Sequence, residues 1–210
     1  MHLFSRSIHM MGPEPEVTDR AIELRDYVSK NLGQDVSLWR LMLGAPVGSF
    51  LCTTRVDGLA GVQAMAQSLA NDETWHAMVA RGRAWTTAAP VDALGEAVQG
   101  SLDAGPPPVG SVATFTTAVI ANGAYSAAIA WGADVTIHVE KVTGMRTLFL
   151  VETAGTFGGV RWIAISPDAK SADAANLALN ADAAYIEKLG EIAHLFLPGS
   201  GHRAIANRIA

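Results

Sequence analysis

Hydrophobic positions along the first hundred residues follow helical spacing in some segments and form short continuous runs in others. Between residues 14 and 32, Val17, Ala21, Leu24 and Val28 recur at spacings of four, three and four, which places them on one face of a helix. Gly33 follows where a glycine commonly ends a helix. Short runs of β-branched and apolar residues flank this segment and predict strands. The expected order is a strand at 3–10, a helix at 14–32, strands at 36–43 and 49–56, a helix at 59–82 and a strand at 94–99.

The long segment 59–82 contains a break signal at Asn71-Asp72, where Asp72 is suited to cap a second helical piece. The same pattern then returns in the second half of the chain. Residues 46–75 match residues 156–185 at a constant offset of 110 without a gap. This match sets Asp72 against Asp182 and Trp75 against Tyr185. The second half therefore predicts strands at 112–120, 146–153, 160–166 and 203–209, and helices at 124–142 and 172–195.

The segment between the copies, residues 101–110, is rich in proline and glycine and predicts a stiff, exposed linker. We therefore expect a first unit at 1–100, the linker at 101–110 and a second unit at 111–210. Each unit has the order β-α-β-β-α-β, which is the ferredoxin-like arrangement.

The run Ser68–Trp75, followed by the strand around residues 92–100, resembles the dimeric α/β-barrel superfamily. That superfamily includes antibiotic-biosynthesis-monooxygenase-like and NIPSNAP-like proteins. The resemblance extends over nearly all of the chain, but it rests on element order and a loose pattern. It implies an α+β fold in which tandem ferredoxin-like repeats pair their antiparallel sheets into one barrel.

Composition excludes several classes of protein. The 210 residues include 15 Lys and Arg against 20 Asp and Glu, and the net charge of −5 argues against nucleic-acid binding through bulk charge. The single cysteine, Cys52, excludes an internal disulfide and is expected to be a buried structural thiol. The uncharged stretch 104–133 is interrupted by prolines and polar residues, so we expect no membrane span. The first residues lack the apolar core of a secretory signal, which predicts a cytoplasmic protein.

Few residues suggest chemistry directly. The glycine-rich run 155–159 joins two strands and predicts a turn rather than a phosphate loop. The six histidines are scattered, so no metal site and no cofactor is predicted. His9, at the end of the first strand, is the best candidate for a catalytic base by residue type and position. It is expected either to point into the barrel or to lie at its rim.

The resemblance also raises the question of whether this protein binds haem. In related proteins that bind or degrade haem, a helix histidine is the axial ligand, supported by an asparagine on the first strand and a tryptophan. His76 lies on a helix beside Trp75, but the first strand offers no asparagine. Adjacent helical residues also point about 100° apart. Whether a haem binds at His76 stays open at this point.

Three residues are candidates for substrate binding: Trp39 and Arg40 on the strand 36–43, and Trp162 in the second unit. An arginine in an apolar strand needs a partner, which can be an acidic ligand or an ion pair within the protein. In the second unit, Glu152 and Arg161 flank one hairpin and can pair across it.

The first helices of the two units differ in charge. Residues 14–30 carry eight charged side chains, whereas residues 124–142 carry only three. A helix without a polar face is usually buried. We therefore expect Ala124, Ala128, Ile129 and Trp131 to form a contact with another subunit or a protein partner, and the protein to be a homo-oligomer.

Two functions remain open from the sequence. The first is binding of a small hydrophobic molecule, with a cofactor-independent, monooxygenase-like reaction as the form that the resemblance implies. The second is a non-catalytic ligand-binding or assembly module of the same fold. A pocket with His9 or Arg40 pointing in would favour the first, and a filled barrel the second.

Overall fold

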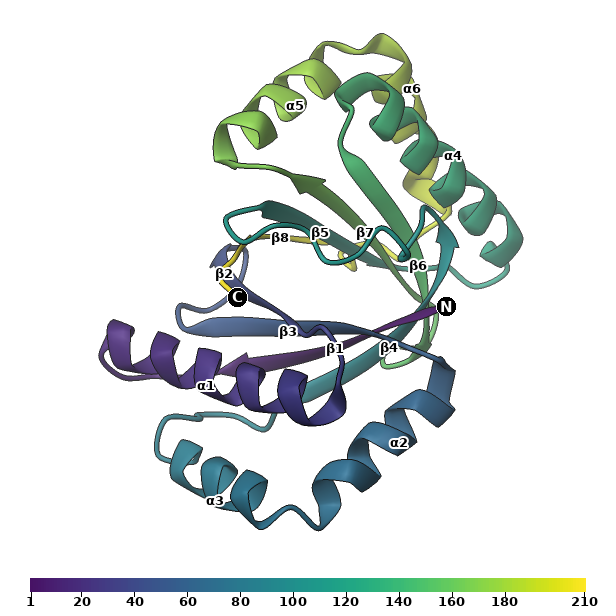
Figure 1. Cartoon of the computed structure of the whole chain (residues 1–210). Helices are drawn as coiled ribbons and strands as arrows, with labels where there is room; N and C mark the ends of the chain where they lie inside the picture. The colour runs from purple at the N-terminus through teal and green to yellow at the C-terminus, as the bar shows by residue number, and fades with distance from the viewer.

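Eight antiparallel strands close into one barrel in the computed structural model, which describes all 210 residues (Figure 1). Every neighbouring pair of strands is antiparallel, so the barrel has no free edge. The order around the barrel is β1 (His2–His9), β3 (Ser49–Val56), β2 (Ser37–Leu43), β8 (His202–Arg208), β5 (Val112–Val119), β7 (Gly159–Ser166), β6 (Arg146–Ala154) and β4 (Val91–Gln99).

The barrel consists of two sheets of the same design. Strands of the first half form the order β4-β1-β3-β2, and strands of the second half form β8-β5-β7-β6. The two sheets join through β2 with β8 and through β4 with β6. The predicted α+β fold of tandem ferredoxin-like repeats that pair their sheets into one barrel is confirmed. The boundaries at residues 100 and 111 stay a prediction.

Helices cover the outer faces of both sheets (Figure 1). The first unit carries α1 (Glu14–Leu32), α2 (Gly58–Ala70) and α3 (Glu73–Gly82). The second carries α4 (Tyr125–Thr143), α5 (Ala169–Ala181), α6 (Ala183–Gly190) and the short η1 (Glu191–His194). The predicted helix break is confirmed, because the Asp72 side chain accepts a hydrogen bond from the Trp75 N–H and caps α3. Asp182 caps α6 in the same way through Tyr185.

Large apolar side chains fill the middle of the barrel. Trp39 and Phe115 meet edge to face there, with ring centroids 5.8 Å apart. The Trp39 indole N–H donates to the Thr53 hydroxyl, so this buried polar atom is satisfied. The cluster around the two rings also contains Leu3, Leu51, Leu148, Leu150 and Ile163. The middle of the barrel is therefore a packed core and not a substrate chamber.

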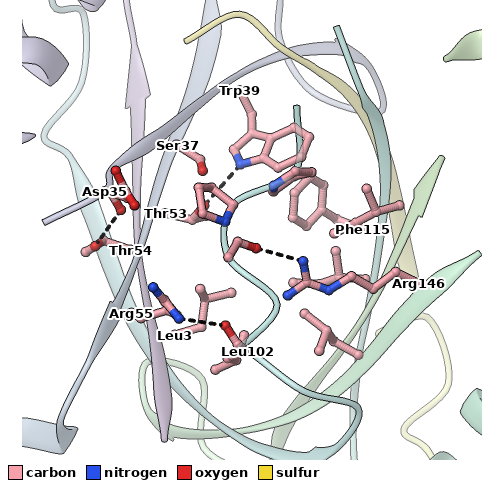
Figure 2. A pocket seen from close by; sticks show the side chains of 16 residues that line it. Leu3, Asp35, Ser37, Trp39, Thr53, Thr54, Arg55, Leu102, Phe115 and Arg146 are labelled. Carbon is pink, nitrogen blue, oxygen red and sulfur yellow. Dashed lines mark hydrogen bonds between the residues drawn. The ribbon is translucent and has the colours of Figure 1, made fainter. Parts of the chain in front are cut away.

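The linker 101–110 closes one end of the barrel, contrary to the expectation of an exposed connector. Leu102 is only 5% exposed and belongs to the barrel core. The Arg55 guanidinium donates to the Leu102 carbonyl (Figure 2). Arg146 donates to the carbonyls of Ser101 and Gly105. About 60 Å³ remains between this plug and the Trp39 side of the core. The apolar side chain of Leu102 explains why the linker folds inward.

None of the helices has the length and apolar character that a membrane crossing requires. The cytoplasmic location stays a prediction.

Candidate functional site

A cavity of about 500 Å³ lies in the first unit, between its helices and the outer face of its sheet. We refer to it as the first-unit cavity. Of the 26 residues that line it, 17 are hydrophobic, which gives the space a mainly apolar wall. The sheet contributes Phe4, Ile8 and Leu38; α1 contributes Leu24 and Val28; α2 contributes Val62, Met65 and Leu69; and α3 contributes Trp75 and Val79.

The sheet places a row of four side chains across the floor of this cavity. The strand registers set Arg6 beside both Asp92 and Cys52, and Cys52 beside Leu38. The Arg6 guanidinium donates to both Asp92 carboxylate oxygens, at 2.7 and 2.8 Å. These charged hydrogen bonds raise the pKa of Arg6 above its ordinary value. The floor therefore offers a fork-like ion pair at the edge of an otherwise apolar space.

Cys52 faces this cavity but is chemically quiet. Burial raises the pKa of its thiol to about 11, because the thiolate would lose its hydration. The thiol is therefore protonated at neutral pH and is a poor nucleophile. The expectation of a structural cysteine agrees with this environment.

A polar contact ties two of the covering helices together. The Tyr27 hydroxyl of α1 lies 2.8 and 2.6 Å from the two oxygens of Asp72, at the start of α3. Tyr27 also stacks on Trp75, with centroids 6.3 Å apart and ring planes at 18°. The hydrogen bonds from Tyr27 and from the Trp75 N–H lower the pKa of Asp72. In the second unit, His138 and Asp182 make the corresponding contact at 2.8 Å.

The corresponding space of the second unit is filled by aromatic rings. Phe149 and Trp162 stack with centroids 5.0 Å apart, and Trp131 meets Trp162 edge on at 5.9 Å. Phe196 completes the cluster against both tryptophans. Gly132 makes room for it, because a Cβ at this position would lie 2.3 Å from the Phe149 ring. Trp162 stands where the first unit has Cys52, and Phe149 stands where it has Leu38.

His9 lies at the rim of the barrel, one of the two places predicted for it. Its Nε2 is 2.9 Å from the Val47 carbonyl, and its Nδ1 is 2.9 Å from the Thr87 hydroxyl. It is not among the residues that line the first-unit cavity or the plugged end of the barrel. Its catalytic role stays a prediction, and both ring nitrogens already have partners in loops.

The three predicted substrate residues do not lie together. Trp39 points into the barrel core, where it borders the small space under the plug. Arg40 points to the opposite face of its strand and pairs with Glu14 of α1. Trp162 lies in the aromatic core of the second unit. One shared site for these three side chains is not formed, because strand alternation separates Trp39 from Arg40 and Trp162 belongs to the other sheet.

The predicted interface helix has a different environment from the one assumed. Ala128 is 0% exposed and is buried within its own chain. Trp131 packs on Trp162 and Phe196, and its indole N–H donates to the Lys188 carbonyl. Ile129 and Ala124 pack against the same cluster. The second unit therefore accounts for the apolar character of this helix, and the contact with another chain stays a prediction.

His76, the residue at which haem was considered, is turned toward its own backbone. Its Nε2 lies 2.8 Å from the Ala70 carbonyl at the end of α2. Arg6 on the floor of the cavity is paired with Asp92. These residues do not fit a haem-ligating set in this structure.

The residues that sequence reasoning missed are Arg6 and Asp92. They are 86 residues apart and meet only because β1 and β4 are neighbours. The signal that was available is an arginine in the first strand, together with an aspartate at the start of the last strand of the unit.

No protein-family model matches this chain, and no curated protein is found to be similar to it. Solved structures do match. A candidate monooxygenase from Fusobacterium nucleatum superposes with a TM-score of 0.70 at 9% identity, covering 100% of this chain and 92% of that one. The chain has the dimeric α/β-barrel fold.

Other solved structures with this fold extend the match. An anthrone oxidase-like protein superposes with a TM-score of 0.70 at 14% identity, covering 100% of this chain and 92% of that chain. A heme-degrading enzyme from Listeria monocytogenes reaches a TM-score of 0.54 at 10% identity, with 99% of each chain covered. At these identities the likeness establishes the dimeric α/β-barrel fold, and activity has to be argued from the site.

Proposed function

We propose that the first unit binds one small, mainly apolar molecule in the first-unit cavity. A volume of about 500 Å³ lies within the roughly 300–1,000 Å³ of small-molecule sites. Such sites are mostly hydrophobic with a few placed polar groups, and this cavity has an apolar wall with Arg6 and Asp92 on its floor. The apolar body of the ligand would lie between α1, α2 and the sheet, and a polar group of the ligand would meet the ion pair.

The observation that carries the proposal is the contrast with the second unit. There the same space is packed by Phe149, Trp162 and Trp131. The fold therefore does not require a hollow at this position. An empty apolar space lowers stability, at about 24 cal/mol per Å³ of cavity in measured cases. The first unit keeps a cavity where the second unit is filled, and this contrast supports the presence of a bound ligand in the first unit.

The sharpest test copies the second unit into the first. Cys52→Trp with Leu38→Phe places on the first sheet the rings that Trp162 and Phe149 place on the second. We expect native mass spectrometry and solvent extraction of the purified wild type to reveal a co-purifying small molecule, and the double variant to lose it. Ile137→Trp, on the exposed side of α4, adds a ring outside the cavity and is expected to keep the ligand.

The outcomes separate the two units. If Trp162→Phe loses the molecule while the double variant Cys52→Trp/Leu38→Phe keeps it, the site lies in the second unit, as the sequence suggested for Trp162. If both of these variants keep the molecule, the proposal is contradicted.

An oxygenase reaction is the finer form of this function. The fold neighbours include a candidate monooxygenase and an anthrone oxidase-like protein, and this analogy supports the reaction class. One O₂ would convert a substrate methylene to a ketone, with one oxygen atom entering the product and the other leaving as water. Asp92 is the only carboxylate that lines the cavity and is the candidate proton acceptor.

Oxygen uptake with anthrone as the probe tests this form. We expect wild-type protein to accelerate uptake and Asp92→Asn to abolish the acceleration, while the apolar wall of the cavity keeps most of the ligand affinity. Binding without any oxygen uptake would instead favour the non-catalytic alternative.

A further inference from the structure

A second, polar cavity lies at the end of the barrel opposite the linker plug. It has a volume of about 340 Å³ and is lined by the second halves of β1, β5 and β6, the starts of β4 and β7, and the hairpin after β6. We refer to it as the mouth cavity. It shares only Asp92 with the first-unit cavity. Hydroxyl groups of Ser5, Ser7 and Thr117 line it, so its chemistry differs from that of the apolar site.

An ion pair lies at the base of the mouth cavity. Arg161 of β7 donates from Nη2 to the Glu152 carboxylate at 2.8 Å, and from Nη1 to the Ser5 hydroxyl at 2.9 Å. The Arg161 and Glu152 side chains are only 13% and 9% exposed. The expected pairing across this hairpin is confirmed. The other Glu152 oxygen accepts from the Thr156 N–H at 2.9 Å, so the carboxylate is fully engaged.

The glycine-rich hairpin is shaped around this carboxylate. A Cβ added at Gly155 or Gly159 would lie 2.8 or 2.9 Å from the Glu152 oxygen. The glycines therefore let the backbone approach Glu152 and hold it against Arg161. This gives the run 155–159 a role beyond that of a turn.

The first unit shows that the fold does not need charges here. By the offset of 110, Arg161 is equivalent to Leu51 of the first unit. Glu152 is equivalent to Leu41, because Phe149 of β6 and Leu38 of β2 occupy matching positions in the two units. Both leucines belong to or pack on the barrel core. A buried ion pair is on average no more stabilising than apolar side chains of similar size. Stability alone therefore does not account for charges beside an open cavity.

Arg161 keeps donors that the chain does not use. Its guanidinium has five N–H groups, of which two are engaged by Glu152 and Ser5. Its Nε makes no hydrogen bond within the chain and is not among the buried polar atoms left without a partner, so this N–H is not sealed off in the interior. Arg161 lines the mouth cavity, and the Nε N–H is the donor that remains for a ligand there. Ser7 and Thr117 also line this cavity, and their hydroxyls are two more groups that can donate at its wall.

We propose that the mouth cavity is a second binding site, specific for a small organic carboxylate that is held by Arg161. A guanidinium fork matches a carboxylate in plane, with two parallel N–H···O bonds. Ser7 and Thr117 donate to the second oxygen, and Glu152 keeps the fork oriented. Val91 and Val119 at the wall give the apolar body of the acid a surface to pack on.

Acetate and benzoate are the probes, and the ¹⁵N NMR spectrum of the full chain is the readout. We expect both acids to shift the backbone signals of Ser7, Thr117 and Thr156 in a saturable way, with benzoate the tighter because of its ring. Inorganic phosphate at the same concentration is expected to shift them less. Shifts with phosphate and none with either acid would overturn the assignment to carboxylates.

Two variants test the role of Arg161. Glu152→Leu with Arg161→Leu copies the first unit, so it is expected to fold while its affinity for benzoate falls at least about tenfold. Arg161→Lys keeps the charge but not the fork, and a several-fold loss is expected even where the double variant does not fold. Lys188→Gln, which removes a cation paired with Asp134 away from the cavity, is the control. Unchanged benzoate affinity in Arg161→Lys would overturn the proposal.

Discussion

The two units of this barrel share one topology and differ in what lies beneath their helices. In the first, α1, α2 and α3 cover a cavity of about 500 Å³. In the second, α4 and its neighbours cover stacked aromatic rings. The difference depends on a few positions, chiefly Cys52 against Trp162 and Leu38 against Phe149. Element order therefore determines the fold, while a few side chains on one face of the sheet determine whether a unit can take a ligand.

The largest expected effect comes from hollowing the filled unit. Phe149→Ala removes a ring that is 0% exposed and stacked on Trp162. We expect it to lower the free energy of unfolding by about 3–5 kcal/mol, measured by denaturant titration. Leu38, at the matching position of the first unit, borders existing space, so Leu38→Ala is expected to cost less, about 2 kcal/mol. An equal loss in both variants would contradict the contrast between the units.

The next prediction concerns the outer face of α4, the first helix of the second unit. Ala130 lies on the exposed side of α4, whereas Ala128 is buried within the chain. If α4 forms a contact between chains, Ala130→Glu should reduce the mass in light scattering toward the 22.0 kDa of one chain. The change places a charge in an apolar contact, which is unfavourable. A wild-type mass of 22.0 kDa at micromolar concentration would defeat the prediction of a homo-oligomer.

The two units can also be compared by their stability in acid, through the Tyr27–Asp72 and His138–Asp182 contacts. Hydrogen bonds lower the pKa of Asp72 through Tyr27 and of Asp182 through His138. A lowered folded-state pKa means that each carboxylate stabilises the fold above about pH 4 and loses this contribution as the pH falls through the folded value. We expect the melting temperature of Asp72→Asn to fall less between pH 7 and about pH 3 than that of the wild type. Asp182→Asn should behave alike, and an unchanged pH profile in both would contradict the prediction.

The smallest effect concerns Cys52, which the second unit replaces by Trp162. Because burial raises the pKa of its thiol to about 11, alkylation by iodoacetamide should be slow at pH 8 and accelerate toward pH 11. A ligand in the first-unit cavity should slow it further. Rapid labelling at pH 7 would show that the thiol is more open to solvent than its environment indicates.

Local pattern was sufficient for most of the fold. The spacing of Val17, Ala21 and Leu24 predicted a helix at 14–32, and α1 has those bounds. The cap at Asp72 was visible because an N-cap depends on one side chain and the next few residues. The repeat at an offset of 110 then predicted one design used twice, and the topology follows it.

The candidate sites were harder to predict, because they depend on contacts between distant residues. Trp39 and Arg40 were both proposed to bind substrate, yet alternation sends one into the barrel and pairs the other with Glu14. Trp131 looked like an interface residue because its partners Trp162 and Phe196 lie 31 and 65 residues away in the chain. Arg6 and Asp92 meet through strand pairing that no local pattern reveals.

The linker that closes one end of the barrel has a consequence for how the two halves could diverge. When a barrel is made from two identical chains, every substitution appears twice, and its closure depends on concentration. Here residues 101–110 tether the halves, and Leu102 anchors the tether in the shared core. Pairing of the two sheets is then intramolecular, so the barrel stays closed at any dilution. Each half is free to carry its own substitutions, so one can keep an open chamber while the other serves as its rigid support.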